Sequence, residues 1–365
     1  MSEWQTFCLK DLGKIVGGAT PSTNNPKNYG NKIAWITPKD LSTLQGRYIK
    51  KGSRSISRLG FKSCSCMLLP KHAILFSSRA PIGYVAIAKK RLCTNQGFKS
   101  IIPNKKIYFE FLYYLLKYHK DNISNIGGGT TFKEVSGATL GLFKVKIPPT
   151  YYEQQKIART LSILDQKIEN NHKINELLHT LAYKIYEYYF KYKPKNANLE
   201  QIIIENPKSS IMVKNAQKTQ DKYPFFTSGD NILFYPKAII DGRNCFLNTG
   251  GNAGIKFYVG KASYSTDTWC ICANEFSDYL YLLLSSIKTH INQSFFQGTS
   301  LKHLQKNLLK KYPIYMPSAH EIKKFNQIIM PLLTFISINT RISKKLEQIR
   351  DFLLPLLLKQ QVKPQ

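Results

Sequence analysis

The 365-residue sequence has few acidic residues. Its 22 Asp and Glu stand against 53 Lys and Arg, so the formal net charge at pH 7 is +31. A surface with this excess of positive charge attracts polyanions, and DNA or RNA is the first partner that it predicts. An anionic membrane surface is the second candidate partner. A merely basic protein from a lysine-rich proteome is a third interpretation.

Long apolar runs are also missing. The longest ones, such as Phe352–Leu358, fall far short of the roughly 20 residues that a membrane-spanning helix needs. The first residues include Glu3, Lys10 and Asp11 and contain no apolar core of a signal peptide. With 43% hydrophobic residues the chain can still build a sizeable core. We therefore expect a folded cytoplasmic protein.

The sequence contains seven cysteines, and an odd number argues against a disulfide framework in a chain without an export signal. The pairs Cys64-x-Cys66 and Cys270-x-Cys272 could suggest zinc. Zinc ligands are more often separated by two or more residues, and no two histidines of the sequence lie three or four residues apart. We expect these cysteines to be buried strand residues and expect no metal site in the chain.

Motifs of the common DNA-linked enzymes are absent from the sequence. Gly260-Lys261-Ala262 lacks the first glycine and the hydroxyl residue of a phosphate-binding loop. Ile147-Pro148-Pro149-Thr150-Tyr151 has isoleucine where an amino-methyltransferase needs Asn or Asp. Glu321-Ile322-Lys323 lacks the Pro-Asp of a nuclease, whose carboxylates would hold Mg²⁺. We therefore expect no catalytic residue and no bound cofactor. A stand-alone methyltransferase or nuclease is an alternative, and it predicts activity from the chain alone.

The sequence repeats itself, which indicates two copies of one structural unit. Gly129–Lys133 recurs as Gly298–Lys302, and Val145–Pro148 recurs as Ile314–Pro317. The match continues through two later segments of similar apolar spacing and is looser upstream of them. The expected order is therefore domain, helix, domain, helix, with a shared scaffold and different polar residues in the two domains.

Two long helices are predicted by apolar residues spaced three and four apart. The first covers Glu153–Phe190 and the second runs from Ala319 to about Gln360, where Pro331 and Pro355 predict a kink or break. A rod of about 40 residues is roughly 60 Å long. An amphipathic rod cannot bury its apolar face alone, so we expect an antiparallel pair that relates the two domains by a rough two-fold axis. The alternative is that each helix packs only on its own domain.

The predicted fold class is α+β, with two domains that alternate with the two helices. The expected boundaries are residues 1–150 and 194–318 for the domains and residues 151–193 and 319–365 for the helices. Glycine, proline and asparagine clusters separate the shorter elements. The clearest of these are strands at Lys32–Ile36, Ala73–Phe76, Tyr84–Ala88 and Lys144–Ile147 and a helix at Tyr108–Lys120.

Several short strings of the sequence occur in a specific order, namely Trp4, Leu12–Ser22, Ile33–Leu41, Ser78–Gly83, Thr94–Phe98 and Ile147–Ile157. In these strings the chain resembles the specificity subunit of type I restriction–modification systems, and the resemblance covers essentially the whole chain. Each string is short, but their order and the repeat are specific. The second half departs from the pattern, because Phe226–Asp230 replaces Ile36–Asp40 and Glu-Ile-Lys replaces Glu-Gln-Gln.

The resemblance implies a DNA-targeting subunit without a catalytic site. It implies two target-recognition domains held apart by two helices, and a split double-stranded DNA site with a spacer of fixed length. It also implies partners, namely modification subunits that bind S-adenosylmethionine and restriction subunits that use ATP and Mg²⁺. On this basis all three cofactors are expected on the partner subunits. An RNA-binding or structural coiled-coil protein remains an alternative, and it predicts no preference for a split duplex site.

Polar loop residues that differ between the two halves are the candidates for DNA contact, because base edges are read by paired donors and acceptors. An ordinary solvated loop residue is the alternative at each position. The candidates are Thr37, Lys39, Ser78, Arg79, Asn95, Gln96 and Lys133 in the first domain and Ser228, Asp230, Asn248, Thr249, Asn252, Thr266, Asp267 and Lys302 in the second. Two glycine-containing loops could meet phosphates through backbone N–H groups. They are Gly127–Thr131, which includes Thr130 and Thr131, and Gly298–Ser300, which includes Thr299.

Overall fold

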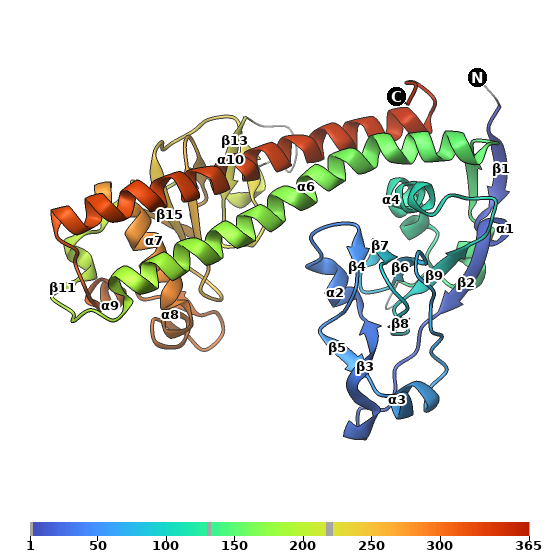
Figure 1. Cartoon of the computed structure of the whole chain (residues 1–365), viewed down its shortest axis with the longest axis horizontal. Helices are drawn as coiled ribbons and strands as arrows, with labels where there is room; N and C mark the ends of the chain where they lie inside the picture. The colour runs from blue at the N-terminus through green and yellow to red at the C-terminus, as the bar shows by residue number, and fades with distance from the viewer. Residues whose placement is uncertain (1–2, 130–132, 217–221, 365) are drawn as a thin grey trace. The chain divides into compact units, whose positions relative to one another are not determined.

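The computed structural model describes residues 3–129, 133–216 and 222–364, which form two compact units. The first unit combines Met1–Asn170 with Lys345–Gln365, and the second is Asn171–Lys344. Two long helices, α6 (Tyr151–Tyr186) and α10 (Ala319–Leu358), contribute to both units (Figure 1).

The first unit places helices on a mixed sheet. Its strands are β1 (Gln5–Cys8), β2 (Gly13–Gly17), β3 (Tyr29–Ile36), β4 (Tyr48–Ile49), β5 (Arg54–Ile56), β6 (Ile74–Ser78), β7 (Ile82–Ala88), β8 (Cys93–Thr94), β9 (Lys99–Pro103) and β10 (Lys144–Ile147). Its shorter helices are α1 (Leu9–Leu12), η1 (Pro26–Asn28), α2 (Pro38–Ser42), α3 (Arg58–Lys62), α4 (Phe109–Asn125) and α5 (Gly137–Leu142). The sheet orders are β2-β9-β6-β7-β4, β5-β3-β8 and β1-β10.

Strand β6 is fully buried because both of its faces are covered. Ile74 and Phe76 point to the core beneath α4, while Leu75 belongs to a second core on the opposite face. This alternation follows from the two-residue period of a strand. Helix α4 packs across β7 and β6. The predicted strand at Lys32–Ile36 lies inside β3, and the predicted strand at Ala73–Phe76 overlaps β6.

The second unit repeats this strand order. Its strands are β11 (Ala197–Asn198), β12 (Ile204–Glu205), β13 (Tyr223–Phe226), β14 (Leu233–Tyr235), β15 (Arg243–Asn248), β16 (Ile255–Val259), β17 (Ser263–Tyr264), β18 (Thr268–Cys272), β19 (Phe296–Gln297), β20 (His303–Leu304) and β21 (Pro313–Ile314). Its helices are η2 (Glu187–Lys191), η3 (Leu199–Gln201), η4 (Val213–Asn215), η5 (Asn274–Phe276), α7 (Ser277–Ser286), α8 (Lys288–Ser294) and α9 (Lys306–Lys310). The sheet orders β12-β18-β15-β16, β14-β13-β17 and β11-β21 match β2-β9-β6-β7, β5-β3-β8 and β1-β10, and β19-β20 is an additional pair.

The long helices pack on the sheets and on each other within each unit. In the first core Ile157 and Leu161 of α6 join Leu354 of α10, and α4 lies in the same cluster. In the second unit Asn171 Nδ2 donates to Ser343 Oγ at 3.2 Å, and Asn175 Nδ2 donates to Thr340 Oγ1 at 3.3 Å. The helices therefore run in opposite directions there. Packing on the domain and packing on the other helix occur together rather than as alternatives.

Of the kink or break predicted at Pro331 and Pro355, the break is wrong. Helix α10 continues through both prolines over 40 residues (Figure 1). A proline removes one hydrogen bond to the carbonyl four residues earlier. At Pro331 that carbonyl belongs to Gln327, and both residues are exposed, so water can satisfy it while the opposite face stays packed.

The apolar face of α6 is also less buried than its spacing predicts. Ile157 and Leu161 are buried, but Ile174, Leu177 and Leu181 are exposed, and Leu177 has a relative exposure of 70%. Apolar residues at three- and four-residue spacing cover a wider arc of the helix than its contacts within this chain occupy.

We predict that Phe325→Ala lowers the free energy of unfolding of the second unit by about 3–5 kcal/mol. Phe325 is fully buried, and its ring lies 4.9 Å from the ring of Phe190, measured between centroids. Phe335 on the same helix is 57% exposed, so Phe335→Ala is a matched control with an expected change under about 0.5 kcal/mol. Urea denaturation followed by circular dichroism measures both, and equal losses would contradict the assigned core.

Candidate nucleic-acid interface

The candidate residues of the first unit follow the ends of neighbouring strands. Strands β3 and β8 are parallel, with Ile36 opposite Thr94. Thr37 and Asn95 therefore leave the sheet at the same edge, and the Asn95 N–H donates to the Ile36 carbonyl at 2.9 Å. The sequence-predicted loops after these two strands thus lie together.

Two more candidate segments join this edge. The Ser78 N–H donates to the Gly97 carbonyl at 2.8 Å, and the Val135 N–H donates to the Ser78 carbonyl at 3.0 Å. Glu134 accepts from Arg79 Nη1 at 3.4 Å and from Lys99 Nζ at 3.2 Å. The Arg79 side chain keeps 37% exposure. The segments after β3, β6 and β8 and the segment Glu134–Val135, next to Lys133, therefore lie together at one end of the first unit.

Thr37 shapes its loop as well as flanking it. Its Oγ1 donates to Asp40 Oδ2 at 2.7 Å, and the second Asp40 oxygen accepts the Ser53 N–H at 2.7 Å. Burial alone would raise the pKa of Asp40, but the hydrogen bonds from Ser53 and Thr37 outweigh it and lower the pKa below its usual value. Asp40 stays ionised and holds the start of α2, next to the exposed Lys39.

The second unit builds a corresponding edge with different residues. Ser228 follows β13, Thr249 follows β15 and Asp267 follows β17. The hydroxyls of Ser228 and Thr249 both donate to the Asp267 carbonyl, the latter at 2.8 Å. The Gly251 N–H donates to the Lys302 carbonyl at 2.9 Å, which brings the fourth candidate segment to the same place.

Lys256 of β16 holds two of these loops by hydrogen bonds, a role that the sequence pattern does not predict. Its Nζ donates to the Thr227 carbonyl at 2.6 Å and to Asn248 Oδ1 at 3.3 Å. Asn248 Nδ2 in turn donates to the Asn252 carbonyl at 3.1 Å. Burial lowers the pKa of Lys256, and the carboxylates of Asp230 and Asp267 oppose that shift. A single lysine within an otherwise apolar strand was the one available signal.

Exposure divides the candidate residues into three groups. Exposed side chains are those of Lys39, Gln96, Lys133, Asp230, Asn252, Thr266, Thr299 and Lys302. Partly buried side chains are those of Thr37, Arg79, Asn95, Ser228, Thr249 and Asp267. Ser78 and Asn248 are buried, which argues against direct base contact by these two. These two side chains point into the protein, because successive residues of a strand point to opposite faces. They support the loops from the interior.

The first glycine loop is only partly placed. Thr130 and Thr131 lie outside the described residues. The N–H groups of Gly127 and Gly128 donate to the carbonyls of Ser124 and Glu134. Those two amides are therefore used within the protein and do not fit the expected phosphate contact.

Of the two Cys-x-Cys pairs, only the one in the second unit has the expected strand positions. Cys270 and Cys272 lie in β18, whereas Cys64 and Cys66 follow α3 without belonging to a strand. Cys93 is buried beside Cys66, and burial raises the pKa of its thiol to about 11. Among the described residues no group of three potential ligands has the arrangement of a metal site. Over the same residues no helix has the length and apolarity to cross a bilayer.

A family model described as the type I restriction modification DNA specificity domain matches residues 1–180 and again residues 196–348. The chain belongs to this family. The specificity subunit of the MjaIX type I restriction enzyme of Methanocaldococcus jannaschii is 33% identical over 97% of this chain and 92% of its own length. A putative type I specificity subunit of Mycoplasma genitalium is 22% identical over 75% of this chain and 72% of its own length.

The fold agrees with this family. The crystal structure of a type I restriction–modification S subunit from M. genitalium superposes with a TM-score of 0.63 at 18% identity, over 97% of this chain and 96% of that chain. The specificity subunit described here is therefore a DNA sequence-specificity component of a type I restriction–modification system, and its role is targeting rather than catalysis.

We predict that Lys256→Met loosens the loops of the second unit without weakening its core. Loss of the two charge-assisted hydrogen bonds to the Thr227 carbonyl and Asn248 Oδ1 should cost about 1.5–3 kcal/mol each. The cost falls on the loops, because these bonds join loop residues and not the apolar core. Hydrogen exchange at the Gly229 and Asn248 amides should speed up by about tenfold or more. Lys261→Met, at an exposed turn, is the control. Unchanged exchange at both amides would show that Lys256 does not hold the loops.

Proposed function

We propose that this specificity subunit reads a split duplex site, with one unit on each half, and so directs methylation or cleavage by partner subunits. The proposal rests mainly on one observation. The two units have the same strand order, and corresponding loops lie at corresponding strand ends. The loops differ in chemistry, so each unit recognises a different short sequence.

Side chains that are exposed or partly exposed supply the groups that base reading needs. The first unit offers Arg79, whose forked donors suit guanine, and Gln96, whose amide suits adenine. The second offers Asn252 for adenine and Asp230, whose carboxylate accepts from cytosine N4. The net charge of +31 supplies sequence-independent attraction to phosphates.

The long helices are proposed to fix the spacer between the two halves. In this proposal the units are copies of one scaffold related by a pseudo-two-fold axis, with α6 and α10 antiparallel along their whole length. The domains are residues 1–150 and 194–318, joined by the helical segments 151–193 and 319–365. This proposal is supported by the residues of α6 and α10 that lie in the hydrophobic core of each unit.

The catalytic steps are assigned to partners. Modification subunits that bind S-adenosylmethionine and restriction subunits that use ATP and Mg²⁺ would dock on the subunit, and its action on chromosomal DNA places it in the cytoplasm. Exposed apolar side chains on the long helices, among them Leu177 and Phe335, offer surface for such docking.

The decisive experiment compares genomic DNA methylation in cells with the gene, without it, and with the gene restored. We expect one methylated motif made of two short parts and a fixed gap to disappear on deletion and to return on restoration. An unchanged methylation pattern, or the loss of a motif without a gap, would refute the split-site proposal.

Arg79→Ala is predicted to relax recognition at one base pair of one half-site. A bidentate arginine contact discriminates by about 1–3 kcal/mol, so the preference should fall by roughly 10- to 100-fold at that position. Arg91→Ala serves as the control, since Arg91 is an exposed arginine at the opposite ends of β7 and β8. Methylation of a randomised site library measures both. A uniform loss over all sequences would instead assign Arg79 to phosphate contact.

A further inference from the structure

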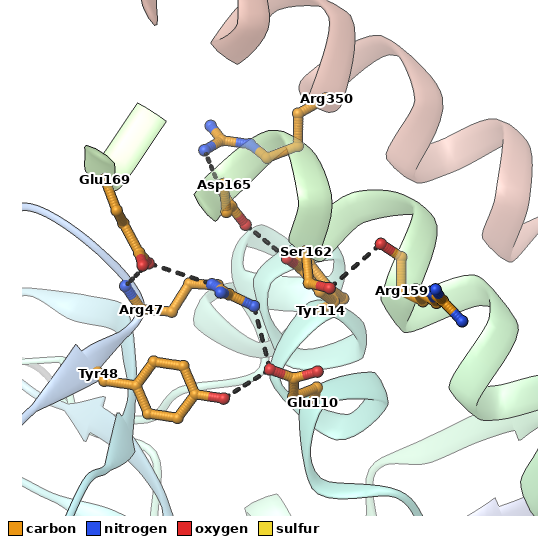
Figure 2. Close-up of polar contacts among 9 residues, drawn as sticks. All are labelled: Arg47, Tyr48, Glu110, Tyr114, Arg159, Ser162, Asp165, Glu169 and Arg350. Carbon is orange, nitrogen blue, oxygen red and sulfur yellow. Dashed lines mark hydrogen bonds and ion pairs between the residues drawn. The ribbon is translucent and has the colours of Figure 1, made fainter. Parts of the chain in front are cut away.

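A buried arginine connects the DNA-reading domain of the first unit to the long helix α6. Arg47 lies just before β4, and its side chain is 8% exposed. Its Nη1 donates to Glu110 Oε1 on α4 at 3.1 Å, and its Nε donates to Glu169 Oε1 on α6 at 3.1 Å. Its backbone N–H donates to the same Glu169 oxygen at 2.9 Å. Figure 2 shows the guanidinium between the two carboxylates.

The surroundings hold this arginine in place. The Arg47 carbonyl accepts the Ile87 N–H of β7 at 2.8 Å, which fixes it in the main sheet. Tyr48 Oη donates to Glu110 Oε1 at 2.5 Å (Figure 2). Burial opposes the charge of Arg47, but the neighbouring anionic groups keep its pKa above the usual value. Sheet, α4 and α6 are thus joined at one buried charge.

A second polar link ties the same domain helix to both long helices. Tyr114 Oη of α4 donates to Asp165 Oδ2 of α6 at 2.5 Å. Arg350 Nη1 of α10 donates to the other Asp165 oxygen at 2.6 Å (Figure 2). The side chains of Arg350 and Asp165 are 12% and 5% exposed. The first reading domain is therefore held by directional bonds at two separate places.

The second unit makes the same kind of connection from a different strand. Arg243, at the start of β15, donates to both Asp278 oxygens at 2.5 Å, to Thr334 Oγ1 at 3.0 Å and to the Met330 carbonyl at 3.2 Å. Asp278 is the second residue of α7, as Glu110 is of α4. Because β4 and β15 are not corresponding strands, the repeated scaffold alone does not account for both arginines.

These bonds restrict orientation more than they add net stability. Apolar packing is non-directional, so a domain held only by it can tilt on a helix at small cost. Arg47 is bonded to two carboxylates, so a tilt of its domain on α6 would leave a charge unpaired, which is strongly unfavourable, although the intact pair contributes little compared with apolar residues. Arg243 keeps Asp278 in either case, and a tilt on α10 would break its charge-assisted hydrogen bonds to Thr334 and Met330.

We propose that Arg47 and Arg243 are positioning residues that set the angle of each DNA-reading domain on the long helices, and thereby the spacer length that the subunit accepts. The inference rests on the proposed split-site function. It assigns spacer selectivity to the attachment of the domains as well as to the length of the helices.

The test is Arg47→Lys in the full subunit assembled with its modification partners. Lysine keeps the positive charge but presents one compact group in place of the fork that reaches both carboxylates. Methylation is measured on duplexes that carry the native half-sites with the native spacer or a spacer one base pair shorter or longer. The preference for the native spacer should fall by about tenfold, which corresponds to roughly 1.4 kcal/mol. The half-site sequences that the subunit recognises should stay the same.

Two controls separate positioning from loss of stability. Arg91→Lys, at an exposed turn, should leave spacer preference unchanged. Ile123→Ala removes a fully buried side chain of α4 away from the arginine and should lower methylation at all spacers in proportion. If Arg47→Lys does not fold, Glu169→Gln keeps the Arg47–Glu110 pair, and its spacer preference should fall in the same direction.

The outcomes are distinguishable. Unchanged spacer preference in a folded Arg47→Lys or Glu169→Gln subunit would overturn the positioning role. A proportional loss at every spacer, as expected for Ile123→Ala, would also overturn it. If the unaltered subunit itself shows no split site, the proposed function fails instead.

Discussion

The structure depends on the burial of two amphipathic helices that cannot be stable alone. In each unit the apolar residues of α6 and α10 are buried against a sheet and a domain helix. The three contributions form one core, so neither helix is a passive linker. The core of the first unit consequently needs Leu354 and Leu357 from the far end of the chain as much as its own strands.

On this scaffold the candidate DNA-binding surface of each unit lies at strand ends. Within each unit a parallel strand pair, β3–β8 in the first and β13–β17 in the second, sends its loops out at one edge of that unit. The end of β6 or of β15 joins them. Backbone hydrogen bonds between the loops, such as those of Ser78 and Asn95, are made by groups that every residue carries. Side chains at the rim can therefore vary while the scaffold stays the same, which suits two readers with different targets.

The regular elements were predictable because their signals are local. The periodic spacing placed α6 and α10 closely, and the apolar runs placed β3, β6 and β7. Strands of two residues, such as β4 and β8, exist only because of their neighbours in the sheet. The continuation of α10 through Pro331 depends on which side of the helix faces solvent. Loop composition located the candidate edge, but Lys256 and Arg47 depend on tertiary contacts that sequence spacing does not contain.

The division of the chain into units also sets an order of assembly during synthesis. Residues 171–344 are contiguous, so the second unit has all its parts as soon as that segment is made. The first unit lacks Leu354, Leu357 and Leu358 of its core until α10 has been translated. Domains usually fold in the order in which they are translated. Here the unit that is translated first is completed last, and the core residues of α4 and α6 lack their packing partners until the C-terminal turns of α10 have been made.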